Sequence, residues 1–218
     1  MTEPAKPNTV VAVVLAIVAA AGMAYACIAQ SWLHNPRTKQ QLTVGFGLLS
    51  NYECQGEECT RMSNRELVAA WQKQLADVRE RAKQDAADPQ TQAFVAQAMQ
   101  ELKVTSAFPT LGYVTLGCAA LAALSLLACA GLVLAKKRVA WPIMPTTTAI
   151  LGIAVGLITG CVFVALKPGP PGYVGVHLGF FAFGAGVIVG IIAALMMNKL
   201  LRPHDPDLLE DSMNPEQY

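Results

Sequence analysis

The residues of this chain whose type and spacing most clearly indicate covalent chemistry are two cysteines, Cys54 and Cys59. Four residues separate them, and one of these is Gly56, which allows a sharp turn. Two thiols so close in sequence are expected to form a disulfide if their segment faces an oxidising compartment. The alternatives are a pair of unpaired surface thiols or a metal site, but a C-x4-C pair without a second ligand pair is not a typical metal motif. The sequence therefore predicts a disulfide.

Other candidate chemistry is sparse. The remaining cysteines fall in apolar stretches, where a thiol behaves as a small apolar side chain; they are Cys27, Cys118, Cys129 and Cys161. His177 lies near the start of an apolar stretch, but no second intramembrane histidine exists with which it would share a haem or a metal. No nucleophile–base pair, phosphate-binding loop or carboxylate pair is visible. We expect a protein that is not an enzyme, with no catalytic residue, no cofactor and no metal.

Four apolar stretches must position these residues, and none of them contains Asp, Glu, Lys or Arg. Each holds more than the ~20 residues that a helix needs to cross ~30 Å of hydrocarbon, and a helix satisfies its own backbone groups in lipid. Charged residues make up 14% of the chain, against about 25% in a soluble domain. The predicted fold class is an all-α membrane protein: a four-transmembrane-helix bundle with a small extracytoplasmic domain between the first two helices. The predicted spans are residues 9–32, 111–135, 142–166 and 173–198.

A cluster of positive charge predicts the orientation in the membrane. Lys136, Lys137 and Arg138 lie in a short connector between the second and third spans, and short basic loops stay cytoplasmic. We therefore expect a multi-pass protein of the plasma membrane (the cell's inner membrane) with both termini cytoplasmic. The net charge of +1 does not indicate a nucleic-acid partner. The predicted segments outside the spans are the cytoplasmic N-terminus 1–8, the extracytoplasmic domain 33–110, the cytoplasmic loop 136–141, the outer turn 167–172 and a disordered cytoplasmic tail 199–218.

The first apolar stretch also has one property of a cleaved signal peptide. Ala24-Tyr25-Ala26 has the small-x-small pattern of a cleavage site. However, the leader before the stretch holds one Lys against one Glu, and the apolar run is longer than the 7–15 residues of a typical signal sequence. We therefore expect the stretch to be retained as a span.

The extracytoplasmic domain divides into a strand region and a helical pair. Apolar residues alternate from Leu42 to Leu48, which is typical of a short strand. After Ser63, apolar residues recur at helical spacing, and Asp88-Pro89 begins a second helix. Fewer than 80 residues bury little core alone, so we expect part of the apolar surface of this domain to contact a partner. The predicted partner surface is Phe46, Leu48, Leu49, Tyr52 and Trp71.

Glycines recur at intervals of four in the last two spans. Small residues on one helix face let two backbones approach closely, and such packing holds helices together in lipid. The glycines are predicted to pack the helices of the bundle, with an oligomer interface as the alternative. They are Gly152, Gly156, Gly160, Gly175, Gly179, Gly186 and Gly190.

The order of several residues after the first span resembles the pattern of a known family. Trp32 follows the first span, then come Gly47-Leu48-Leu49, then Cys54 and Cys59. In this order the chain resembles the claudin-like four-span superfamily, which includes the peripheral myelin protein and epithelial membrane protein branches. Members carry a Gly-Leu-Trp segment, where this chain has Leu49 in place of Trp, followed by two disulfide-bonded cysteines. The resemblance implies a short sheet over a left-handed four-helix bundle, and a role in adhesion, barrier formation or chaperoning of a membrane partner.

Together these patterns favour a non-enzymatic integral membrane protein that acts by protein–protein contacts. The expected role is that of a structural, adhesion or adaptor subunit of the cell envelope. The expected partners are the lipid bilayer and another membrane protein, or a second copy of the chain. The alternative is an oligomeric pore or channel. Because no ionisable residue lies deep in any span and transport pathways usually carry such residues, the first function is preferred.

Overall fold

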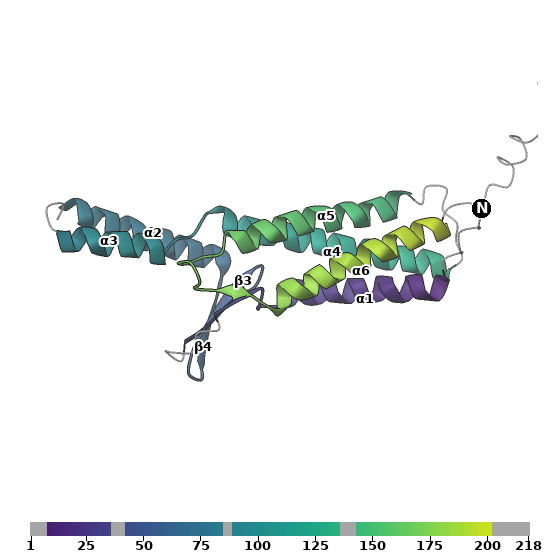
Figure 1. Cartoon of the computed structure of the whole chain (residues 1–218), viewed down its shortest axis with the longest axis horizontal. Helices are drawn as coiled ribbons and strands as arrows, with labels where there is room; N and C mark the ends of the chain where they lie inside the picture. The colour runs from purple at the N-terminus through teal and green to yellow at the C-terminus, as the bar shows by residue number, and fades with distance from the viewer. Residues whose placement is uncertain (1–7, 36–41, 85–88, 136–142, 202–218) are drawn as a thin grey trace, which may run out of the picture.

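Four long apolar helices lie side by side in a bundle (Figure 1). The computed structural model describes residues 8–35, 42–84, 89–135 and 143–201. Each of the four helices is long and apolar enough to cross a membrane, which confirms the predicted four-helix class of fold. The basic cluster that predicts the orientation lies outside the described residues. The helices are α1 (Thr9–Ile28), α4 (Ala107–Leu134), α5 (Ile143–Ala165) and α6 (Leu178–Leu201).

The helices do not coincide with the apolar stretches of the sequence. α1 ends at Ile28, because the chain then turns so that the backbone N–H of Trp32 donates to the Phe46 carbonyl. α4 begins at Ala107, earlier than predicted, and includes Phe108. α6 begins at Leu178, later than predicted, because the residues before it form a strand. The apolar residues beyond the ends of α1 and α6 thus pack at the end of the bundle.

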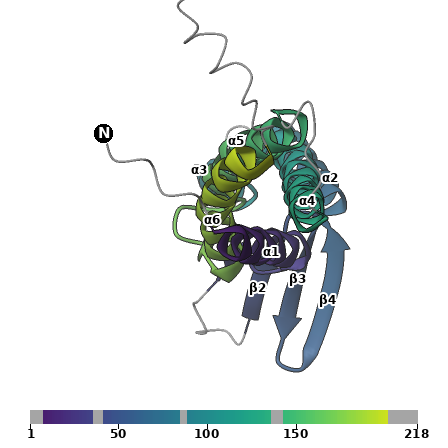
Figure 2. The same ribbon diagram turned by 90° about the vertical axis from the view of Figure 1, so that its right-hand side faces the viewer.

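Small residues form the helix–helix contacts of the bundle. α1 packs mainly against α6, and α4 mainly against α5, which Figure 2 shows in a view along the helices. Alanines such as Ala12, Ala16 and Ala19 are buried along α1 at helical spacing. Because alanine and glycine leave little side chain between two backbones, helices approach closely at these positions.

The predicted packing glycines face other elements of the same chain, with one exception. In six of the seven, an added Cβ would lie within 3.4 Å of an atom of another segment of the chain: Gly152, Gly156, Gly160, Gly179, Gly186 and Gly190. The nearest atoms belong, for example, to Cys118 for Gly152 and to Met23 for Gly186. Gly175 differs from the prediction because it lies in a strand. Five of these contacts are between helices of the bundle, and Gly179 contacts the connection between α1 and β1.

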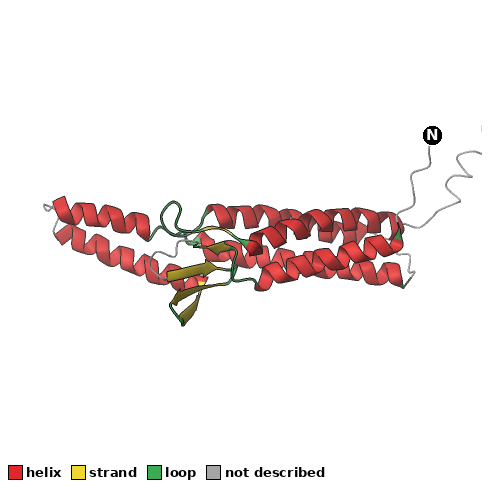
Figure 3. Cartoon of the chain, turned by 60° about the horizontal axis from the view of Figure 1, so that its bottom comes forward, coloured by secondary structure: helices red, strands yellow, loops and turns green. Residues whose placement is uncertain are grey.

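A five-stranded antiparallel sheet lies at one end of the bundle (Figure 3). Four strands come from the segment between α1 and α4, as predicted for a strand region there. The fifth comes from the connection between α5 and α6 and pairs with the first, in the order β4-β3-β2-β1-β5. The strands are β1 (Leu33–His34), β2 (Leu42–Phe46), β3 (Ser50–Gln55), β4 (Glu58–Ser63) and β5 (Gly175–Val176).

An aromatic cluster joins the sheet to the bundle. The Phe46 ring meets the Phe108 ring edge to face with centroids 6.1 Å apart, and Phe108 stacks on Phe163 at 4.4 Å. Trp32 is fully buried and contacts Phe163 and Phe183. Large aromatic side chains bury much area per residue, so this cluster fixes the sheet on the ends of the helices.

The two remaining helices form a hairpin that extends away from the bundle (Figure 1). They are α2 (Asn64–Gln84) and α3 (Pro89–Glu101). α2 begins with a capping box: the Ser63 backbone N–H donates to Glu66 Oε2 at 2.9 Å, and the Glu66 N–H donates to Ser63 Oγ at 3.1 Å. The Asn64 side chain donates to the carbonyls of Gly47 and Leu48, which ties the start of α2 to the sheet.

The capping box predicts a local response to acid. Hydrogen bonds from Ser63 hold the pKa of Glu66 below its ordinary value of 4.5. A lowered pKa stabilises the folded state above the unfolded pKa, and this contribution is lost as the pH falls through the folded pKa. We expect the protection of the α2 N-terminus against amide hydrogen exchange to fall as the pH is lowered below about 4.5. Glu66→Gln keeps the cap and should remove this pH dependence; an unchanged dependence in the variant would contradict the assignment.

Candidate functional site

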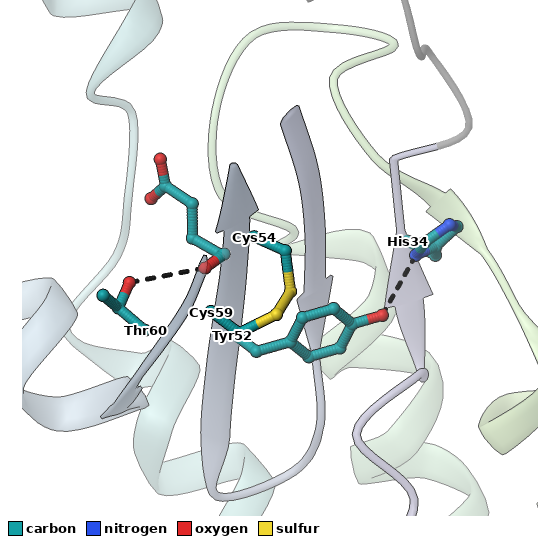
Figure 4. The surroundings of a disulfide bond; sticks show 6 residues. His34, Tyr52, Cys54, Cys59 and Thr60 are labelled. Carbon is teal, nitrogen blue, oxygen red and sulfur yellow. Dashed lines mark hydrogen bonds between the residues drawn. A yellow bond between two sulfur atoms is a disulfide. The ribbon is translucent and has the colours of Figure 1, made fainter. Parts of the chain in front are cut away.

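The candidate site lies on the sheet face that points away from the bundle, here called the distal face. Successive residues of a strand point to opposite faces, and Phe46 and Val44 are buried toward the bundle. Gly45 therefore lies on the distal face, together with its cross-strand partners His34 and Tyr52. Cys54 and Cys59 lie on the same face two residues further along their strands (Figure 4).

The disulfide predicted between Cys54 and Cys59 is present. The two residues are directly opposite each other on β3 and β4, with their Cα atoms 4.0 Å apart. Gln55 and Glu58 pair next to them and close the hairpin, and Gly56 adopts φ +62° in the turn. A left-handed residue in a two-residue hairpin turn favours glycine, so the sequence at 55–58 places the two thiols in register.

Removing the disulfide should destabilise the β3–β4 hairpin by about 2 kcal/mol, because the closed loop is short and constrains few unfolded conformations. The double variant Cys54→Ser/Cys59→Ser should therefore unfold at a lower temperature than the wild-type protein. Cys161→Ser, which replaces an exposed free cysteine, is the control and should leave the unfolding temperature unchanged. Dithiothreitol should lower the unfolding temperature of the wild type and of Cys161→Ser, which both keep the disulfide; an equal effect on the double variant would contradict the prediction.

Tyr52 crosses the neighbouring strand and reaches a histidine. An added Cβ on Gly45 would overlap the Tyr52 ring, so the glycine leaves the space in which that ring lies. The Tyr52 hydroxyl is 3.3 Å from Nδ1 of His34 (Figure 4). Tyr52, one of the residues predicted for the partner surface, is therefore half-buried on the distal face and positions His34.

His34 in turn lies beside His177. Their ring centroids are 4.8 Å apart, with an interplanar angle of 43°. Burial lowers the pKa of His34, and the neighbouring His177 lowers it further, so the folded protein favours the neutral His34 ring. His177 directly follows β5, and its backbone N–H donates to the Trp32 carbonyl at 2.9 Å. The pairing of β1 with β5 thus brings together two histidines that are far apart in the sequence.

The sequence alone does not indicate this pair of histidines. His177 was predicted within the fourth helix, where a second histidine would have to lie inside the membrane, whereas His34 is in a strand outside the helices. No local pattern indicates that β5 pairs with β1, because the two strands have two residues each. The weak signal in the sequence is that His34 directly follows the first apolar stretch and His177 lies near the start of the fourth.

The predicted partner surface requires a correction. Phe46 and Leu48 are each 1% exposed, because they point toward the bundle and cover its aromatic cluster. Trp71 is partly buried against the core. Leu49 is 37% exposed and remains accessible. The apolar side chains of the strand region therefore find their contacts largely inside the chain.

The more exposed apolar side chains of this region lie on α3. Phe94 is 63% exposed and Met99 is 43% exposed. A groove between α2 and α3 is lined by apolar residues, including Val78 and Ala98, and by charged residues, including Asp77 and Arg81. Neither Phe94 nor Met99 belongs to the partner surface predicted from the sequence.

The fold and this site together define a multi-pass membrane protein whose helix bundle carries a disulfide-bonded sheet at one end. Among the described residues, no group of three or more His, Cys, Asp or Glu side chains is arranged to hold a metal ion. No protein-family model matches the chain, and a comparison with curated proteins gives no match.

Proposed function

We propose that the protein is a non-enzymatic membrane subunit that acts through protein–protein contacts made by its α2–α3 hairpin and sheet. One observation carries this proposal: α3 exposes Phe94 and Met99 on a hairpin that extends beyond the bundle (Figure 1). Lipid covers the apolar residues exposed on the membrane helices, but it does not reach this hairpin. A large exposed apolar side chain outside the membrane is typical of a binding surface.

The dimensions of the hairpin fit this role. α2 has 21 residues, which corresponds to a length of about 30 Å. Two helices bury only one stripe of each other, so the opposite faces stay exposed. α3 has 13 residues, and a helix as short as about 12–15 residues is marginal in water without further packing. A partner that covers Phe94 would supply such packing.

The kind of contact that we propose, adhesion or adaptor contact, follows from the resemblance to the claudin-like superfamily. We retain this resemblance as part of the proposal. Three features support it: Trp32 buried beneath the sheet, the Gly47-Leu48-Leu49 segment beside it, and the Cys54–Cys59 disulfide across two strands. Members of that superfamily combine a short sheet with a four-helix bundle. The α2–α3 hairpin is an addition to that pattern, and we assign adhesion or adaptor contacts to it.

We further propose that the sheet and the hairpin are extracytoplasmic and that both termini are cytoplasmic, in the plasma membrane. The Lys136-Lys137-Arg138 sequence after α4 and Lys199 in the last turn of α6 support this orientation. The disulfide also favours an oxidising compartment. After mild reduction of intact cells, a membrane-impermeant maleimide should label Cys54 and Cys59. A cysteine introduced by Ser212→Cys should be labelled only after lysis, and the reverse pattern would overturn the orientation.

Site-specific photo-crosslinking tests the proposed contacts. A photoreactive amino acid at Phe94 should give a discrete protein adduct in cells, because the hairpin contacts its partner there. The matched control places the same amino acid at Leu124, which is 66% exposed on α4 and should crosslink to lipid. Mass spectrometry of the Phe94 adduct distinguishes another membrane protein from a second copy of the 23.1 kDa chain. Equal, diffuse labelling at both positions would argue against the proposal.

A further inference from the structure

We propose that His34 and His177 form a binding site for a divalent late first-row transition-metal ion, Zn²⁺ or Cu²⁺. The pair lies on the distal face, where β1 meets the residue that follows β5. Imidazole nitrogens suit zinc and copper, whereas calcium and magnesium prefer oxygen ligands. The site is independent of the contacts proposed for the α2–α3 hairpin.

The separation of the two rings fits coordination of one ion by both. A metal–nitrogen bond of about 2 Å places each ring centroid about 3 Å from the ion. Two such ligands at an angle of about 90–110° then have centroids about 4.5–5 Å apart. The observed separation is 4.8 Å. This separation lies within the range expected for two histidines that share one ion.

Tyr52 supplies the interaction that orients a metal-binding histidine. Its hydroxyl lies 3.3 Å from Nδ1 of His34, so a neutral ring that donates its Nδ1 proton to this oxygen presents the Nε2 lone pair to the ion. Ligating histidines commonly donate their other ring N–H in this way. Gly45 contributes indirectly to the orientation of His34, since any side chain at position 45 would displace the Tyr52 ring.

The backbone holds both ligands in place before an ion binds. His34 is in β1, which pairs with β2 on one side and with β5 on the other. The His177 N–H donates to the Trp32 carbonyl, and the Gly179 N–H donates to the Ser31 carbonyl. The bound ion would therefore join the first and the last segments of the sheet. Water would fill its remaining coordination positions, because no third His, Cys, Asp or Glu completes the group within the described residues.

Calorimetric titration with ZnCl₂ tests the site on the full-length protein in nanodiscs, purified without a histidine tag. The wild type should bind one equivalent. His34→Ala and His177→Ala should each lower the affinity more than tenfold, and Tyr52→Phe should lower it by about tenfold. The third histidine of the chain, His204, provides the control, and His204→Ala should bind as the wild type does. Unchanged binding in either His34→Ala or His177→Ala, or no binding by the wild type, would overturn the proposal.

Electron paramagnetic resonance with one equivalent of CuSO₄ gives a second readout, which reports the ligands of the bound ion. In the wild type, two imidazole ligands should produce superhyperfine splitting of the copper signal by two nitrogens. In His177→Gln, the splitting should come from one nitrogen. A spectrum that is identical in the two proteins would exclude joint coordination. Because His177 is exposed, its replacement should leave the elution volume and near-ultraviolet circular dichroism unchanged. Zn²⁺ should also raise the unfolding temperature of the wild type but not of His177→Gln.

Discussion

Replacement of Trp32 by alanine is expected to destabilise the protein by about 3–5 kcal/mol, the range for a large aromatic residue removed from a core. Trp32 is fully buried where the sheet meets the bundle, and its ring contacts Phe163, Phe180 and Phe183 with centroids 5.4–5.9 Å apart. Its indole N–H also donates to the Ala26 carbonyl at 2.7 Å. That carbonyl belongs to the last turn of α1, where no intrahelical donor is available.

Thermal unfolding in detergent, followed by circular dichroism, measures this loss. Trp32→Phe is the matched variant, because it keeps an aromatic ring in the cluster while it removes the N–H donor and the smaller part of the ring system. It should lose about 1–3 kcal/mol, the effect of leaving a buried acceptor unpaired. If Trp32→Ala unfolded at the wild-type temperature, the aromatic cluster would not be what holds the sheet on the bundle.

Gly112→Ala is expected to give the second large effect. Gly112 is buried on α4, and an added Cβ would overlap the carbonyl oxygen of Leu48. A backbone carbonyl moves only with its loop, and the Asn64 side chain holds this one by a hydrogen bond of 3.0 Å. Overpacking of this kind typically costs about 1–3 kcal/mol. We therefore expect a lower unfolding temperature and faster hydrogen exchange in the Gly47–Leu49 segment.

The same helix provides the control for that substitution. Gly117 is exposed on α4, and an added Cβ would have no neighbour within 4 Å. Gly117→Ala should be neutral or stabilising by up to about 1 kcal/mol, because alanine favours the helix. Equal effects of the two substitutions would show that the close approach of α4 to Leu48 does not contribute to stability.

Features that depend on local sequence were predictable. Long runs without charge identify the four helices, since each run is a property of one segment alone. The disulfide was predictable for the same reason: Gly56 and the short separation of Cys54 from Cys59 define a hairpin without reference to the rest of the chain. The helical hairpin followed from the periodicity after Ser63 and from Asp88-Pro89.

Features that depend on pairing between distant segments were not predictable. Whether Phe46 and Leu48 face solvent or the bundle depends on which side of the sheet meets the helices, and alternation does not determine that side. The proximity of His34 and His177 depends on the pairing of β1 with β5, two strands too short to leave a pattern. The end of α1 and the start of α6 were misplaced because the residues next to them, in the connection from α1 to β1 and in β5, carry no charge and so resemble a continuation of a helix.

The pairing of β1 with β5 also sets an order of events during synthesis. About 140 residues separate the two strands, and chains are synthesised at about 5–20 residues per second. One edge of β1 therefore stays open for about 7–30 seconds while α4 and α5 are produced and inserted. During that interval the nascent sheet presents unpaired backbone groups to any neighbouring strand. A chain that is released before residue 175 keeps this edge permanently, so truncated products of this protein should be the form most prone to associate through their strands.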